Sequence, residues 1–150
     1  MEKKAQAFLI TTVILISILA AFIGVSNYSK KTTFSTLPYL AQEIQIESEK
    51  VMDYDLNTGN DTIENFTKTI SNYTDENTKI YFIINKSGLE CYSYNKTLDK
   101  EPLSCNVINN QINTTIEETN YTFPYFPEAK HFYFIIIKED ENNKYVYTNN

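Results

Sequence analysis

Oxygen-bearing side chains recur at the spacing of a calcium loop in the segment DYDLNTGNDTIE, which runs from residue 53 to residue 64. Counted from its first residue, positions one, three, five, nine and twelve are Asp53, Asp55, Asn57, Asp61 and Glu64. Calcium prefers carboxylate and amide oxygens, and these are the side-chain ligand positions of a helix–loop–helix calcium site. The pattern therefore predicts one candidate metal site, and no other cofactor is expected.

The same residues also fit a plain turn between two helices. Position six of such a loop is normally glycine, whereas this chain has Thr58 there and Gly59 one residue later. In this alternative, Gly59 ends the first helix, and Asp61 and Glu64 form a capping box for the second. Asn60 also begins a glycosylation sequon, and a glycan there would crowd an ion. We expect the turn and keep calcium as the second interpretation.

Few residues could carry catalysis. His131 is the one histidine, it opens a predicted strand, and the sequence pairs no nucleophile with it. Three separated glycines make no phosphate-binding loop, and two cysteines are too few for a thiolate zinc site. A net charge of −6 without a basic cluster argues against nucleic-acid binding. We therefore expect a protein that is not an enzyme and binds no nucleic acid.

The cysteines and the sequons both favour an exported domain. Cys91 and Cys105 are the two cysteines, and each lies in a predicted strand or strand edge. We expect them to form a disulfide, and two unpaired buried thiols are the alternative. Eight N-x-[ST] sequons begin at Asn27, Asn60, Asn65, Asn72, Asn85, Asn95, Asn113 and Asn120. Their number favours an N-glycosylated surface outside the cell.

The segment AFLITTVILISILAAFIGV, residues 7–25, contains nineteen residues without a charge. As a helix it would span roughly 28 Å, close to the hydrocarbon thickness of a bilayer. A buried core helix and a cleaved signal peptide behind Lys3 and Lys4 are the alternatives. We expect a retained membrane helix over 6–26, a polar neck over 27–35 and an extracellular domain over 36–150, in a single-pass protein of the cell membrane.

The pattern of residues 36–150 predicts an α+β fold. Apolar residues at helical spacing predict one amphipathic helix from Thr36 to about Tyr54 and a second over residues 63–73, with a helical neck as an alternative. From Lys79 onward, strand patterns predict an antiparallel sheet of four to six strands, covered on its apolar face by one helical stripe. Its clear hairpins turn at the KSG of residues 86–88 and at residues 140–143. SCNVI and NTTIEET are weaker strands, and YTFPYFP, residues 121–127, is expected to be a loop whose rings cap the core, or else an exposed adhesive loop.

The chain's start, EKKAQAFLITTVILISILAAFIG, resembles the class III signal of archaeal type IV pilin-like proteins. That resemblance implies a charged leader over residues 1–5 and cleavage by a prepilin peptidase between Ala5 and Gln6. Ala5 stands where many pilins have glycine, and Ile10 stands where many have glutamate. In such filaments the apolar helices pack into a central bundle and the β-rich heads form a sheath.

The resemblance implies a non-enzymatic structural subunit of a type IV pilus-like filament on the cell surface, in the membrane before processing and in the extracellular filament after it. Its partners would be the membrane, the prepilin peptidase and other pilin-like subunits. The subunits would pack through their apolar helices, because such a helix can leave the bilayer only by burying its surface against other apolar helices. The alternative is a permanently anchored extracellular domain for binding or adhesion.

Overall fold

The computed structural model describes residues 36–141 and 143–149 of the chain. The predicted leader, the Ala5–Gln6 cleavage site, the membrane helix over 6–26, the neck over 27–35 and the Asn27 sequon lie outside the described residues. Within the described residues, neither helix has the length and hydropathy needed to cross a membrane.

Among the described residues two helices precede eight strands: the order of helices before strands is as predicted, but the strands outnumber the four to six expected. The elements are α2 (Thr36–Thr58), α3 (Ile63–Tyr73), β1 (Thr78–Asn85), β2 (Leu89–Tyr94), β3 (Lys100–Pro102), β4 (Cys105–Ile108), β5 (Gln111–Ile116), β6 (Thr119–Pro124), β7 (His131–Asp140) and β8 (Asn143–Thr148). The strands form a five-stranded sheet in the order β3-β2-β1-β7-β8 and a three-stranded sheet in the order β4-β5-β6. Every pairing is antiparallel, so the α+β class is confirmed.

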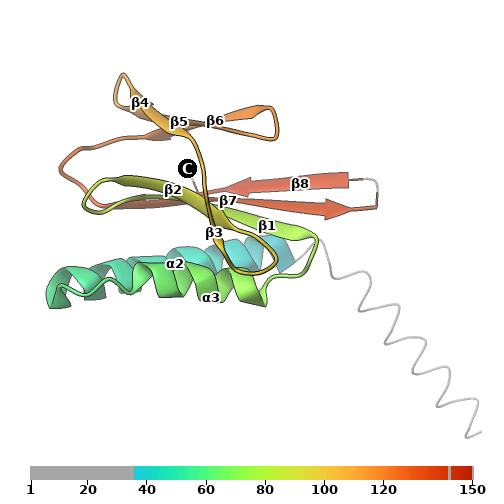
Figure 1. Ribbon diagram of the computed structural model, residues 1–150, viewed down its shortest axis with the longest axis horizontal. Helices are drawn as coiled ribbons and strands as arrows, with labels where there is room; N and C mark the ends of the chain where they lie inside the picture. Colours follow the sequence, from blue (N-terminus) through green and yellow to red (C-terminus); the bar gives the residue numbers. More distant parts are fainter. Residues whose placement is uncertain (1–35, 142, 150) are drawn as a thin grey trace, which may run out of the picture. The chain divides into compact units, whose positions relative to one another are not determined.

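These elements stack in three layers, with the five-stranded sheet in the middle (Figure 1). The helices cover one face of this sheet, and β4, β5 and β6 lie over the other. The central strands β1 and β7 read IYFII and FYFIII, and because both of their faces are covered they carry apolar residues at consecutive positions.

An aromatic cluster fills the space between the helices and the middle sheet. Phe82 on β1 is fully buried, and its ring lies 5.8 Å from that of Tyr92 and 6.0 Å from that of Phe132. From α3, Phe66 meets Phe132 edge-on at 6.1 Å, and the buried Thr67 hydroxyl bonds the Tyr92 hydroxyl at 3.0 Å. The helical stripe predicted to cover the sheet is therefore present.

A second core lies between the two sheets. It is formed by alternate residues of β1 and β7 together with residues of β5 and β6: Tyr81, Ile83, Ile112, Ile116, Phe123, Tyr133, Ile135 and Ile137. The rings of Phe123 and Tyr133 stack at 5.0 Å. A disulfide between Cys91 on β2 and Cys105 on β4, with Cα atoms 6.3 Å apart, confirms the predicted pair and joins the two sheets.

Three predictions about the strands are wrong. The chain has two sheets where one was expected, because the second apolar face of β1 and β7 also needs a cover. The YTFPYFP segment is largely strand β6: it pairs with β5, and Phe123 is only 1% exposed. The NTTIEET segment is not one strand, since Glu117 and Glu118 both have positive φ and form the tight turn from β5 to β6.

Replacing both Cys91 and Cys105 with serine should lower the free energy of unfolding by about 3 kcal/mol, because the disulfide closes a loop between residues 14 apart. Urea unfolding of the oxidised wild type and of the double variant measures this difference. Alkylation of unreduced native protein should label neither cysteine. A reductant should lower the urea unfolding midpoint of the wild type and leave that of the double variant unchanged. Equal unfolding midpoints for the two proteins would contradict the structural role of the disulfide.

Candidate functional site

The five predicted calcium ligands do not form one loop. Asp53, Asp55 and Asn57 lie within α2, which extends to Thr58, four residues past the predicted end. Asn57 donates from Nδ2 to the Asp53 carbonyl at 2.9 Å. Asp61 pairs with Lys86 at 3.2 Å, and Glu64 pairs with Lys100 at 3.4 Å. Within the described residues, no group of three or more His, Cys, Asp and Glu side chains is arranged to hold a metal ion.

Asp55 is instead a structural junction. Its side chain is fully buried, and its two oxygens accept hydrogen bonds from Thr62 N at 2.9 and 3.0 Å, Thr62 Oγ1 at 2.6 Å and Ile63 N at 3.2 Å. The Lys86 ammonium also donates to it, at 2.9 Å. Its backbone carbonyl accepts from Gly59 N at 3.0 Å, and Gly59 has a φ of +71°, so glycine ends α2 as predicted. One residue therefore closes α2, caps α3 and ties both helices to the end of β1.

The contacts of Asp55 determine its charge. Burial alone would raise the pKa of this carboxyl, but the hydrogen bonds from Thr62, Lys86 and Ile63 lower the pKa from 3.8 to about 2. Burial acts to lower the pKa of Lys86, and the Asp55 and Asp61 carboxylates raise it above its ordinary value. Both groups are charged at neutral pH, so they form an ion pair rather than share a proton.

The predicted capping box is wrong. Helix α3 begins at Ile63 with Thr62 as its N-cap, and the Thr62 side chain makes no capping bond. The carboxylate that caps the helix comes from Asp55 in the preceding helix, and Asp61 contacts Lys86 instead. The sequence gives no direct signal for the Asp55–Lys86 pair, because the two residues are 31 positions apart along the chain.

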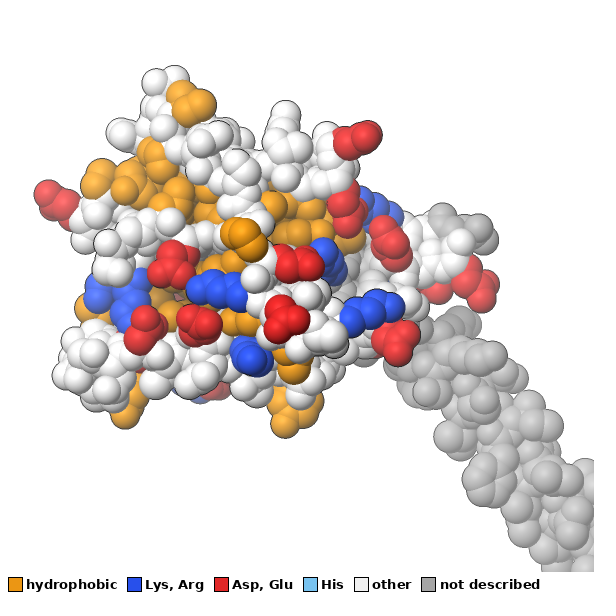
Figure 2. Space-filling view, in the orientation of Figure 1, with side chains coloured by type: hydrophobic (Ala, Val, Ile, Leu, Met, Phe, Trp, Pro, Cys, Tyr) orange, Lys and Arg blue, Asp and Glu red, His pale blue; other side chains and the backbone are white. Residues whose placement is uncertain are grey.

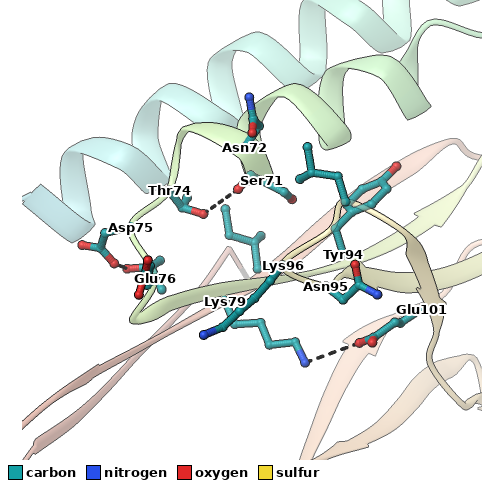
Figure 3. Close-up of a pocket in the computed structure, with 13 residues that line it drawn as sticks. Ser71, Asn72, Thr74, Asp75, Glu76, Lys79, Tyr94, Asn95, Lys96 and Glu101 are labelled. Carbon is teal, nitrogen blue, oxygen red and sulfur yellow. Dashed lines mark hydrogen bonds and ion pairs between the residues drawn. The ribbon is translucent and has the colours of Figure 1, made fainter.

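A polar hollow of about 400 Å³ lies between the end of α3, the start of β1 and the β2–β3 loop (Figure 3). Its volume is within the range of small-molecule sites. Lys79 pairs with Glu101 across it at 3.7 Å, and Lys96 crosses its mouth. Ser71 lines it, and its hydroxyl is buried without a hydrogen-bond partner among the described residues. Figure 2 shows acidic and basic side chains interspersed over this face of the molecule.

The loop beside this hollow is held in a strained conformation. Leu98 has a φ of +60°, which is costly for a branched side chain. The Asn95 side-chain oxygen accepts from Thr97 N at 3.0 Å, Thr97 Oγ1 at 2.8 Å and Asp99 N at 2.9 Å, and these bonds stabilise the turn.

His131 lies beside a second hollow, of about 460 Å³, between α2 and the start of β7. Its ring stacks on Tyr133 at 5.6 Å and lies 5.3 Å from the ring of Phe126. Its Nε2 atom is buried, with no hydrogen-bond partner in the described part of the chain. Aromatic packing therefore accounts for the position of the histidine ring.

Among the sequon asparagines that the structure describes, Asn60, Asn65, Asn72 and Asn120 are exposed, Asn95 and Asn113 are half-buried, and Asn85 is buried. Their third residues differ as much in exposure, from the fully buried Thr67 to the exposed Thr97, Thr115 and Thr122. Comparison of the chain with protein-family models, with curated proteins and with solved structures found no match.

Asp55→Asn should lower the free energy of unfolding by at least about 2 kcal/mol at pH 7. An amide cannot neutralise the Lys86 ammonium, and its NH₂ group would face other hydrogen-bond donors. The carboxylate's contribution is fully present above its unfolded pKa of 3.8 and is lost as the pH falls through its folded pKa of about 2. Urea unfolding at pH 7 and pH 3 measures both effects, and the difference in unfolding free energy between wild type and variant should be smaller at pH 3.

Asp61→Asn is the matched control: the Asp61 side chain is 74% exposed, so the loss of unfolding free energy should stay below about 1 kcal/mol. Equal losses of unfolding free energy in the two variants would contradict the structural role of Asp55.

Millimolar calcium should leave the melting temperature of the domain unchanged, because the Asp55 oxygens already accept protein hydrogen bonds and Asp53 and Asn57 lie within a helix. Titration calorimetry and a thermal melt with and without calcium measure this. Saturable binding that Glu64→Gln abolishes would restore the calcium interpretation.

Proposed function

We propose that this chain is a non-enzymatic structural subunit of a type IV pilus-like filament on the cell surface. Its N-terminal apolar helix would pack against those of other subunits, and residues 36–150 would form the head. A prepilin peptidase would remove the leader over residues 1–5, and the subunit would pass from the membrane into an extracellular filament.

The observation that carries the proposal is that α2 exposes large apolar side chains on the side away from the sheet. Ala41, Ile44 and Met52 are buried on the face toward the sheet. Tyr39 and Ile46, seven residues apart and therefore two turns apart on one face, lie on the opposite side of the helix and are 73% and 46% exposed. A helix that covers a sheet needs one apolar stripe, and large apolar side chains exposed on its outer side are available to pack against another subunit.

Two further observations support an extracellular head. The Cys91–Cys105 disulfide is typical of oxidising compartments. Four of the sequon asparagines within the described residues are exposed, which N-glycosylation of a secreted surface requires.

The alternative is a permanently anchored extracellular domain that binds a ligand or mediates adhesion. The polar hollow of about 400 Å³ beside the strained Leu98 favours this function, because strained loops often border binding sites. The two functions differ in whether the outer face of α2 contacts another subunit.

Ile46→Asp should abolish filaments while leaving the head folded, because a carboxylate placed in a subunit interface would be buried without a partner. Ile108→Asp is the matched control: Ile108 is 56% exposed and lies on β4, in the three-stranded sheet. Both variants should change the free energy of unfolding by less than about 0.5 kcal/mol. The measurement is electron microscopy of cells that carry each variant, together with urea unfolding of the purified heads.

Loss of filaments in Ile46→Asp alone supports the proposal. Normal filaments in cells carrying Ile46→Asp, or no filaments in wild-type cells that display the protein, would contradict it and favour the anchored domain.

A further inference from the structure

Strand β8 (Asn143–Thr148) is an open edge of the middle sheet. It is the last strand in that sheet's order, and its one neighbour among the described strands is β7 (Figure 1). An edge strand presents a row of backbone N–H and C=O groups along its free side, and such a row is a template for pairing with a further strand. The kind of strand that fits depends on which residues of β8 direct these groups outward.

Hydrogen bonds at the start of β7 show which of its backbone groups point toward β8. Phe134 N donates to Asn149 Oδ1 at 2.8 Å, and the Phe132 carbonyl accepts from Asn149 Nδ2 at 3.1 Å. Asn149 directly follows β8, so these two residues of β7 turn their backbone groups toward the β8 side. Direction alternates from residue to residue in an antiparallel ladder, so Ile136 and Lys138 turn theirs toward β8 as well.

The partners of Ile136 and Lys138 in β8 determine the outer edge. They are Tyr147 and Tyr145, whose backbone groups therefore point inward, to β7. The alternate residues of β8, namely Lys144, Val146 and Thr148, each turn one N–H and one C=O to the outer side. Within residues 36–141 and 143–149, no hydrogen bond is made to these outward groups. The edge therefore offers a donor and an acceptor at every second residue along the strand.

A second copy of β8 matches this edge. When two β8 strands run antiparallel about a two-fold axis at Val146, the Val146 residues of the two copies face each other. Lys144 of one copy then faces Thr148 of the other, and every residue with outward groups meets another residue with outward groups. Each outward N–H can donate to a C=O of the opposite strand, as in a regular antiparallel ladder. The edge is therefore complementary to itself.

The side chains of β8 fit the same arrangement. Val146 is 46% exposed and lies opposite Ile137, so it is on the face that borders the core between the two sheets. The two Val146 side chains would cover each other on that face. On the face toward the helices, Tyr145 would lie opposite Tyr147 of the second copy, and the Tyr147 ring already stacks on Phe134 at 6.2 Å. Cross-strand aromatic pairs of this kind stabilise antiparallel sheets.

The charge of β8 does not oppose the pairing. Lys144 is the one charged residue of the strand, and its ammonium pairs with Glu117 in the turn between β5 and β6. In the two-fold arrangement it lies opposite the uncharged Thr148, so no like charges meet across the axis. A lysine often prevents an edge strand from pairing, but here it is already neutralised within its own chain.

The other three edges of the two sheets are less suited to pairing. Strand β3 has three residues and ends at Pro102, and β4 has four residues. Strand β6 has six residues but ends at Pro124, which has no N–H to donate. Short length and proline are the features that keep edge strands from associating. Among the described strands, β8 is the edge that combines six residues with the absence of proline.

We propose that β8 is the docking edge for a second copy of this chain and that the two middle sheets join into one continuous sheet. A single two-fold contact uses the edge of both copies, so association ends at a dimer. Successive subunits of a helical filament make head-to-tail contacts instead. The β8 pairing is therefore a separate contact, and it does not rest on the proposed function.

Cysteine cross-linking of the full-length chain in detergent tests the pairing and its register. Directly opposed residues in a hydrogen-bonded antiparallel pair have Cα atoms about 5.5 Å apart, which is within disulfide range. Mild oxidation should therefore give covalent dimers of Val146→Cys. The native Cys91–Cys105 pair does not compete, because both sulfurs are already bonded. Ile108→Cys is the matched control, since Ile108 is 56% exposed on the β4 edge, and it should stay monomeric.

A mixture of two further variants tests the register. Lys144→Cys and Thr148→Cys chains should cross-link to each other when mixed, and neither should cross-link to itself. A mixture that gives no mixed dimer would overturn the two-fold arrangement about Val146.

Sedimentation of the full-length chain in detergent tests the equilibrium. Wild type should reach a dimer at about 100 μM, since a single strand pair buries a small area and binds weakly. Val146→Lys places two ammonium groups opposite each other and should weaken the dimer by about tenfold or more. Val107→Lys is the matched control, because Val107 is a valine on the β4 edge with 43% exposure, and it should dimerise like wild type. Urea unfolding checks that both variants stay folded.

Three results would overturn the proposal: a wild-type monomer at that concentration, a dimer that Val146→Lys leaves intact, and cross-linking of Ile108→Cys as complete as that of Val146→Cys. A chain that dimerises through β8 but forms no filament overturns the filament alone. Filaments whose solubilised subunits fail these tests overturn the β8 pairing alone.

Discussion

The structure depends on the pairing of β1 with β7, two adjacent strands that are buried on both faces. Phe82 and Phe134 face the helices, and Ile83 and Ile135 face the small sheet, all of them fully buried. Burial of one such side chain stabilises a fold by roughly 1.5–3 kcal/mol, so leaving either face open would cost many times that. The chain therefore needs two covering layers, and the elements on each side of this pair supply them.

Each covering layer is attached to the middle sheet by a specific contact beyond apolar packing. The small sheet is joined by the disulfide from β2 to β4. The helices are joined by the Asp55–Lys86 pair, which connects the end of α2 and the start of α3 to the residue just after β1. Both contacts therefore fix a covering layer to the same middle sheet, one by a covalent bond and the other by a buried ion pair.

Local patterns in the sequence predicted the helices, both main hairpins and the disulfide, because these depend on periodicity, turn residues and a single cysteine pair. Three features depend on contacts distant in sequence and were missed or misassigned. Strand β6 takes in the start of YTFPYFP, a segment with two prolines and aromatics without clear alternation, and only pairing with β5 makes it a strand. The second sheet follows from burial of both faces of β1 and β7, which an apolar run signals only indirectly. Asp55 fitted the calcium pattern because carboxylates bind both metals and helix N-termini. In the structure its carboxylate is neutralised by Lys86, a contact that the local sequence does not show.

N-terminal sequencing of the native protein distinguishes the proposed filament subunit from an anchored domain. The charged Lys3 and Lys4 would cost several kcal/mol inside a bundle of apolar helices, so a subunit that assembles must lose them first. For a filament subunit we expect a protein that begins QAFLITT, at Gln6. A protein that begins at Met1 or Glu2 would contradict it in favour of an anchored domain, and one that begins at Asn27 would contradict both by showing a secreted soluble domain.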